Sequence, residues 1–392
     1  MAMIIKTLRK EEILLISWLK RFYMNSERNN LLILVSFVGL LAMGLVMVSS
    51  ASIFIADEMT GNPFYFISRQ MLFIAIGLMA MLFFMVLPSD FLFKSDWIFM
   101  LLSIILLIAL FIPDVGTSVN GSIRWIRLGP INIQPSEICK FSLILYISGY
   151  SVRRLSEIDT LRSFLKPLLL LFIIAILIMG QPDLGSTAII CLLVVSILFY
   201  AGISFFQFSL LSLMIALLGF VAISRSPMRI ARVMAYMDPF DKDVVLNSGY
   251  QLSNSLISIG QGGWFGLGLG NSFQKDFFLP EAHTDFIFAI LVEELGVLGG
   301  LFLISLFVVL FIGILRVSLD SFSKERLFQG YVTYGILILI AAQSLFNIAV
   351  NIGLLPTKGL TLPFISYGGT SIIIMMSLIG IVLRINNENK LI

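Results

Sequence analysis

Ten long stretches of apolar residues constrain this chain of 392 residues more than any other feature. A helix needs about 20 mostly apolar residues to cross the hydrocarbon core of a bilayer. The stretches cover about 31–55, 66–87, 96–112, 135–150, 165–180, 185–201, 206–224, 284–315, 329–351 and 366–385. In lipid the backbone must satisfy its own hydrogen bonds, which a helix does. The sequence therefore predicts an all-α polytopic membrane protein with ten transmembrane helices.

The composition excludes most other classes of protein. Hydrophobic residues make up 58% of the chain and charged residues 12%, which is about half the charged share of a typical globular domain. This balance excludes an ordinary soluble enzyme, a disordered chain and a small disulfide scaffold. The formal net charge of +3 is too small and too dispersed to indicate nucleic acid as a partner. His283 is the only histidine, which excludes a multi-histidine metal site.

Lysine and arginine in the loops predict the orientation, because cytoplasmic loops carry an excess of both. With the N-terminus in the cytoplasm, sixteen of these residues fall on the inner side and three in the short outer loops. Both termini are then cytoplasmic. We expect a basic cytoplasmic segment at 1–30, one transmembrane domain at 31–386 and a cytoplasmic tail at 387–392. A large extracytoplasmic loop at 225–283 would join the seventh and eighth helices.

Ionisable residues within or beside the spans are candidates for function, because charge at membrane depth is costly. They are Arg69, Glu137, Lys140, Asp183, Asp285, Glu293 and Glu294. Glu137 and Lys140 are three residues apart and share a helix face, so they form either a structural ion pair or part of a wall that binds an anion. Arg69 opens the second span, where it either extends toward the interface or contacts a ligand.

The richest polar segment is 225–294. It contains six glycines between 260 and 270, which allow sharp turns or a close approach to a ligand but also fit a merely flexible segment. No phosphate-binding loop of the Gly-Lys-Ser/Thr type is present. Asp285 stands at the outer mouth of the eighth span, and Glu293 lies ~12 Å deeper by helical rise. Asp285 is placed either to act as a general base or to complement the helix dipole.

The segment 113–134 contains Arg124, Trp125 and Arg127. A tryptophan between two arginines suits a sugar-phosphate headgroup, although it also suits an aromatic anchor at the membrane interface. An anionic substrate would need cations, and Arg69, Arg124, Lys140, Arg229 and Lys358 are the candidates.

Several long motifs occur in an order that resembles the SEDS family of cell-wall proteins. They are GSIRWI at 121–126, QPSEICK at 134–140, GQPDLGST at 180–187, GYQLSNSLISIGQGGWFGLGLG at 249–270, PEAHTDFIFAILVEELG at 280–296 and NIAVNIGLLPTKGLTLPFISYGGTS at 347–371. The resemblance covers roughly 31–386. PTKG and PEAHTDF look more like the division branch of the family than the elongation branch.

The resemblance implies a peptidoglycan glycosyltransferase that polymerises lipid II at the outer face of the bacterial cytoplasmic membrane, at the division septum. It places the catalytic aspartate at Asp285. The expected substrate-binding residues, from the resemblance and the polar pattern together, are Arg69, Arg124, Trp125, Glu137, Lys140, Asp183, His283 and Lys358. The implied partners are lipid II, the nascent glycan, a class B penicillin-binding transpeptidase and division regulators.

Asp285 would accept the proton of the acceptor hydroxyl in an inverting transfer that forms a β-1,4 link. His283 is the competing base by its usual pKa, and Glu281 is the next choice. A divalent cation, Mg or Mn, would be held mostly by the substrate diphosphate. Three other interpretations stay open at this point: a lipid II flippase, an elongation-type polymerase and a non-catalytic scaffold.

Overall fold

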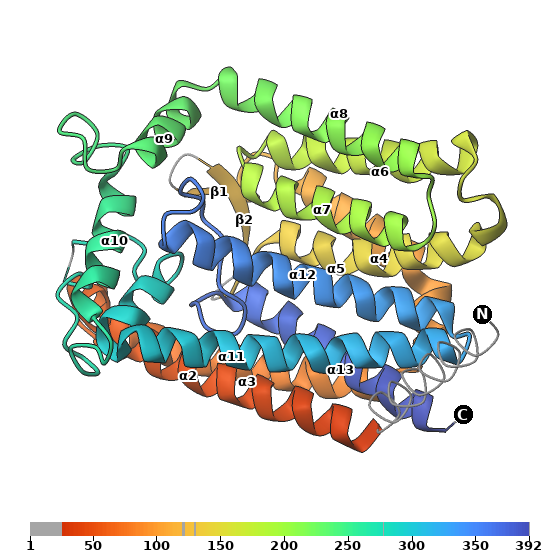
Figure 1. The fold of residues 1–392 in the computed structure, drawn as a ribbon, viewed down its shortest axis with the longest axis horizontal. Coiled ribbons are helices and arrows are strands. Elements are labelled where there is room, and N and C mark those ends of the chain that lie inside the picture. Colours follow the sequence, from red (N-terminus) through yellow and green to blue (C-terminus); the bar gives the residue numbers. More distant parts are fainter. Residues whose placement is uncertain (1–25, 120–121, 129–130, 277, 392) are drawn as a thin grey trace, which may run out of the picture.

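The computed structural model describes residues 26–119, 122–128, 131–276 and 278–391, so most of the expected N-terminal segment 1–30 lies outside the described residues. Long helices lie side by side in one bundle (Figure 1). They are α2 (Ser26–Thr60), α3 (Tyr65–Val86), α4 (Ser89–Ala109), α5 (Pro135–Arg153), α6 (Leu161–Met179), α7 (Leu184–Tyr200), α8 (Phe205–Ser224), α11 (Ile287–Ser323), α12 (Leu327–Asn351) and α13 (Gly369–Lys390). A short 3-10 helix at Leu155–Glu157 follows α5.

Nine helices within the described residues are long and apolar enough to cross a membrane, which confirms the all-α membrane fold. The helix missing from this set is α5, which carries Glu137 and Lys140. It is buried along nearly its whole length and packs against α4, α7 and α12. Neighbouring helices shield its charges from lipid, so α5 does not need an apolar surface. The count of ten spans stays a prediction.

The segment 113–134 folds into a small sheet that the sequence analysis did not predict. Strands β1 (Gly116–Val119), β2 (Ser122–Leu128) and β3 (Ile131–Ile133) pair antiparallel in the order β1-β2-β3. The strands are too short to give a clear alternating pattern in the sequence. Thr370 at the start of α13 anchors β3, since its hydroxyl donates to the carbonyl of Asn132 at 2.9 Å. The sheet therefore packs against the starts of α5 and α13, toward the end of the bundle where α9 lies (Figure 1).

The start of α2 and the end of α13 meet at the opposite end of the bundle (Figure 1). The Ser26 hydroxyl donates to the Asn386 carbonyl at 3.1 Å, and the Asn386 amide donates to the Ser26 carbonyl at 2.8 Å. A polar cluster at the same end joins α4, α12 and α13, where Glu388 accepts from Arg384 at 2.7 Å and from Arg326. Both ends of the described chain thus lie on one side of the bundle.

The segment 225–283, expected as a large loop, contains helices α9 (Pro227–Met237) and α10 (Tyr250–Gly262).

The glycine-rich stretch after α10 runs along α11, where that helix is interrupted at Gly296 with φ of 72°. The amide of Leu267 donates to the Glu293 carbonyl at 2.9 Å, and the amide of Val297 donates to the Gly263 carbonyl at 2.9 Å. A Cβ on Gly266 would lie 2.2 Å from the Glu294 carbonyl oxygen. The glycines therefore let the backbone of this stretch come close enough to α11 to make hydrogen bonds with the backbone groups that the break at Gly296 leaves free.

Glu293 and Glu294 hold this stretch in place from inside the bundle, and both are fully buried. The Glu293 carboxylate accepts from the hydroxyls of Ser258 and Ser272, each at 2.6 Å, and from the amide of Phe273 at 2.9 Å. The Glu294 carboxylate accepts from Lys275 at 2.8 Å and from Ser50. These two acids are candidates for function by sequence. In the structure their hydrogen bonds and ion pair connect α11 to α10, to the stretch after α10 and to α2.

Candidate functional site

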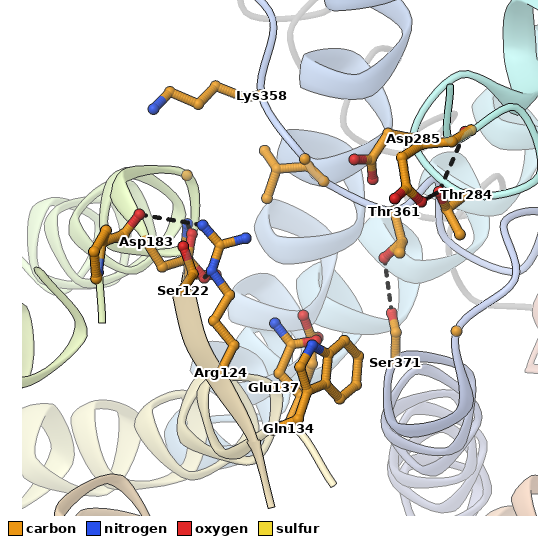
Figure 2. Close-up of a pocket in the computed structure, with 18 of the residues that line it drawn as sticks. Ser122, Arg124, Gln134, Glu137, Asp183, Thr284, Asp285, Lys358, Thr361 and Ser371 are labelled. Atoms are coloured by element: carbon orange, nitrogen blue, oxygen red, sulfur yellow. Dashed lines mark hydrogen bonds and ion pairs between the residues drawn. The ribbon is translucent and has the colours of Figure 1, made fainter. Parts of the chain in front are cut away.

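A cavity of about 670 Å³ lies where the sheet, α9 and the segments before α11 and α13 converge. Seven of the nine sequence-predicted site residues line it: Arg69, Arg124, Trp125, Glu137, Asp183, Asp285 and Lys358. They come from six different segments of the chain, and Figure 2 shows Arg124, Glu137, Asp183, Asp285 and Lys358 around the shared space. The fold thus brings together residues that are up to 289 positions apart, from Arg69 to Lys358.

Asp285 stands just before α11, with its carboxylate next to Gly359. A Cβ at Gly359 would lie 2.8 Å from the Oδ2 atom of Asp285, so any larger residue there would push the carboxylate aside. The side chain lies deep among protein atoms but keeps part of its surface open to the cavity. Burial, followed by the negative charge of Glu281, raises the pKa of Asp285 to about 7. A carboxyl with this pKa can accept a proton near neutral pH.

Glu281 is the neighbouring acid on the cavity wall. Its backbone adopts the left-handed region with φ of 58°. The hydroxyl of Thr284 donates to the Oε2 atom of Glu281 at 2.7 Å. This bond fixes one oxygen of the Glu281 carboxylate, whereas no described hydrogen bond engages the carboxylate of Asp285.

Four cations line the same cavity as the acids: Arg124, Arg229, Arg232 and Lys358. Burial, followed by the charges of Arg232 and Arg229, lowers the pKa of Lys358 to about 8. Burial and then the charge of Arg124 also lower the pKa of Arg232. The positive charges of these side chains repel one another, and a bound anion with several negative charges would relieve that repulsion.

Arg229 and Arg232 both lie on α9 and line the cavity. Arg229 is among the cations expected from the sequence, whereas Arg232 is a cavity residue that was not expected. Their spacing of three residues was the available signal, because residues three apart share a helix face.

Asp183 combines a structural contact with a place on the cavity wall. It caps the start of α7, where it accepts from the Ser186 amide at 3.1 Å and from the Ser186 hydroxyl at 2.7 Å. Its Oδ2 atom also lies 3.7 Å from the Nε atom of Arg124. Arg124 in turn donates to the Pro182 carbonyl at 3.1 Å. Asp183 therefore orients Arg124 toward the cavity.

Glu137 and Lys140 form the ion pair expected from their spacing, with Nζ 2.5 Å from Oε1. Glu137 lines the cavity, and its second oxygen has no hydrogen-bond partner among the described residues. Lys140 is fully buried behind Glu137 and does not line the cavity. In this structure Lys140 contacts Glu137 and not the cavity, and its expected substrate contact stays a prediction.

His283 also does not line the cavity, although it is two residues from Asp285. Its ring packs against Phe66, with the centroids 4.5 Å apart, and against Tyr367 at 5.8 Å. Burial lowers the pKa of His283. The residue is held as an aromatic core side chain, which argues against both its expected substrate contact and its role as the competing base.

The cavity offers no preformed metal centre. Within the part of the chain that the structure describes, no group of three or more His, Cys, Asp or Glu residues could hold a metal ion. A divalent cation held mainly by a substrate diphosphate stays a prediction.

The chain is similar in sequence to known proteins along most of its length. The chain is 44% identical over 354 residues to the probable peptidoglycan glycosyltransferase FtsW of Legionella pneumophila, covering 90% of this chain and 89% of the relative. It is 45% identical over 352 residues to the protein of the same name from Taylorella equigenitalis, covering 89% of this chain and 96% of the relative.

The fold is also similar to solved structures. A chain of a peptidoglycan synthase complex that coordinates polymerization and crosslinking matches with a TM-score of 0.74 and 25% identity, covering 91% of this chain and 97% of that one. The rod shape determining protein RodA of Thermus thermophilus matches with a TM-score of 0.66 and 24% identity, covering 91% of this chain and 96% of that one, which supports the fold alone. A family model described as cell cycle protein, which groups FtsW, RodA and SpoVE, matches residues 30–391. The chain therefore belongs to the FtsW, RodA and SpoVE family of membrane proteins.

Proposed function

We propose that the protein is a peptidoglycan glycosyltransferase that polymerises lipid II during septal cell-wall synthesis. The observation that carries this proposal is the cavity, which the Asp285 carboxylate shares with the cations Arg124, Arg229, Arg232 and Lys358. A base that shares a cavity with several cations suits a reaction in which a hydroxyl attacks a sugar that carries a diphosphate leaving group. The relatives named FtsW support the assignment to cell division.

In the proposed reaction, Asp285 takes the proton from the 4-hydroxyl of the acceptor lipid II. The hydroxyl oxygen then forms a bond to the anomeric carbon of the growing glycan, and the bond from that carbon to the undecaprenyl diphosphate breaks. Attack from the face opposite the diphosphate inverts the α configuration into a β-1,4 link. The cations stabilise the charge that the departing diphosphate gains. Asp285 later returns its proton to solvent.

The location of the site supports an enzyme of the outer membrane face. The cavity lies at the end of the bundle away from the start of α2 and the end of α13, so cytoplasmic termini would place it extracytoplasmically. We propose this orientation in the bacterial cytoplasmic membrane, at the septum. A class B penicillin-binding transpeptidase and division regulators are the proposed protein partners, and the similarity to a chain of a synthase complex supports the first of these.

A flippase is the main alternative, and it would use a broken helix to line a transport path. The break in α11 at Gly296 is filled by backbone of the glycine-rich stretch and does not line the cavity. This arrangement favours chemistry at one face over transport across the bilayer.

The test is polymerisation of purified lipid II by the purified full-length protein, with and without its transpeptidase partner. Long glycan strands that lysozyme degrades are the expected product. Transbilayer movement of lipid II in vesicles without any glycan, in the presence of the partner, would support the flippase instead.

The pKa values of two cavity residues predict a bell-shaped pH dependence of kcat/KM. Asp285 must be ionised to act as a base, so activity rises as the pH increases through about 7. Lys358 must be protonated to attract phosphate, so activity falls as the pH increases through about 8. We expect Glu281→Gln to shift the lower limb to lower pH, because it removes a charge that raises the pKa of Asp285. An unchanged lower limb in that variant would contradict the assignment to Asp285.

Arg232→Gln is expected to lower kcat/KM for lipid II by about ten- to a hundredfold, since a hydrogen bond to a charged group is worth about 1.5–3 kcal/mol. The matched control is Arg154→Gln, which removes an arginine from an exposed ion pair with Glu157 and should leave kcat/KM unchanged. Equal rates for the two variants would remove Arg232 from the proposed site.

A further inference from the structure

The three residues that end at Asp285 are held by other parts of the fold and not by α11. The His283 carbonyl accepts from the Tyr367 amide at 3.0 Å, and the Thr284 carbonyl accepts from the Ser366 hydroxyl at 2.6 Å. The Asp285 carbonyl accepts from the side-chain amides of two asparagines on α12, Asn347 at 2.8 Å and Asn351 at 3.0 Å. Asp285 therefore depends on tertiary contacts for its position.

Asn351 takes the place of a missing helical hydrogen bond. In a regular helix the Asp285 carbonyl would accept from the amide of Ala289, four residues on. Here the Ala289 amide donates to the Oδ1 atom of Asn351 at 3.1 Å and to the Phe286 carbonyl at 3.0 Å. The carboxamide of Asn351 thus stands between the two groups, with its nitrogen on Asp285 and its oxygen on Ala289. This insertion separates Asp285 from the first turn of α11.

Asn347 connects the same carbonyl to the neighbouring segment before α13. Its Nδ2 atom also donates to the Leu360 carbonyl at 2.6 Å. Leu360 follows Gly359, the residue that leaves room for the Asp285 carboxylate. One asparagine therefore holds Asp285 beside the segment that contains Gly359 and Leu360.

Both asparagines are buried and neither lines the cavity, with Asn351 0% and Asn347 2% exposed. The Nδ2 atom of Asn351 also donates to the Asn347 carbonyl at 2.9 Å, so all its hydrogen-bonding groups have partners inside the protein. The Oδ1 atom of Asn347 accepts from Asn351 at 3.3 Å, so both side chains use their polar atoms inside the protein, and both donate to the Asp285 carbonyl.

We propose that Asn351, together with Asn347, is a positioning residue that aims the Asp285 carboxylate at the acceptor hydroxyl. This inference rests on the proposed role of Asp285 as general base. Loss of the carboxamide lets Asp285 rejoin the helix or rotate, which moves the carboxylate away from the reacting hydroxyl. A displacement of about 1 Å can lower the rate of an enzyme a hundredfold.

The test measures lipid II polymerisation by full-length Asn351→Leu, which keeps most of the side-chain volume but removes the carboxamide. We expect kcat to fall about ten- to a hundredfold, with KM within about twofold because the cavity wall is unchanged. Asn347→Ala provides a second variant, and we expect it to lower kcat in the same way if Asn351→Leu does not fold.

The matched control is Asn389→Ala, at the other end of the bundle. Asn389 is also fully buried, donates to the Ser321 hydroxyl at 2.8 Å and accepts from Arg326 at 2.9 Å. Its replacement should lower the Tm in detergent without changing kcat. A purely structural role of Asn351 would give the same result as this control, a lower Tm with unchanged kcat, and would overturn the inference.

The inference and the proposed function fail in different variants. If Asn351→Leu and Asn347→Ala keep their kcat while Asp285→Asn is inactive, the positioning role is wrong and the base assignment stands. If Asp285→Asn itself polymerises at the wild-type rate, the base assignment is wrong, and the positioning role is overturned with it.

Discussion

Replacing Asp285 by asparagine is expected to lower kcat for lipid II polymerisation by about a hundred- to ten-thousandfold, the contribution of a positioned general base. The carboxamide fills nearly the same space beside Gly359 but cannot accept the proton of the acceptor hydroxyl. The protein should still fold and insert, because no described hydrogen bond depends on the Asp285 carboxylate. Gel analysis of glycan from labelled lipid II measures the rate, and the Tm in detergent measures the fold.

His283→Ala is the control for this prediction, because His283 is the other proton acceptor in the same segment. Its ring packs on Phe66 and Tyr367 outside the cavity, so the variant should keep measurable activity. An active Asp285→Asn with an inactive His283→Ala would reverse the assignment. Activity in both variants would direct attention to Glu281, which also lines the cavity.

Lys275→Met is expected to lower the free energy of unfolding by about 3–5 kcal/mol, because it leaves the buried Glu294 carboxylate without its charged partner. The two side chains are 3% and 0% exposed, and the ion pair lies 2.8 Å apart. The pair joins the stretch after α10 to α11 and, through Ser50, to α2. Thermal or denaturant unfolding in detergent provides the measurement.

The double variant Lys275→Met with Glu294→Met should recover much of this loss, since neither charge is then buried alone. The control is Lys390→Met, which breaks an exposed ion pair with Glu27 and should change stability little. A double variant that is less stable than Lys275→Met alone would show that the pair does not act as a unit.

The positions of the membrane helices could be predicted closely because each segment that crosses the bilayer must itself be apolar. The apolar stretch 66–87 corresponds to α3 at Tyr65–Val86, and 206–224 corresponds to α8 at Phe205–Ser224. Whether a stretch is apolar enough depends on its own residues and not on its neighbours. The motifs likewise made Asp285 the candidate base, because a resemblance needs only the local order of residues.

The sequence by itself therefore determined the membrane class, most helix boundaries and the family, and it left Asp285 as one candidate among several ionisable residues. Only the tertiary structure distinguished Asp285 on the cavity wall from Glu293 and Glu294, which are buried between helices, and from His283, which packs in an aromatic cluster. It also revealed the asparagines that hold Asp285 from 62 and 66 residues away. The physical reason is that charge and polarity are local properties of a residue, whereas a hydrogen-bond partner or a place on a cavity wall depends on chain segments that only the fold brings together.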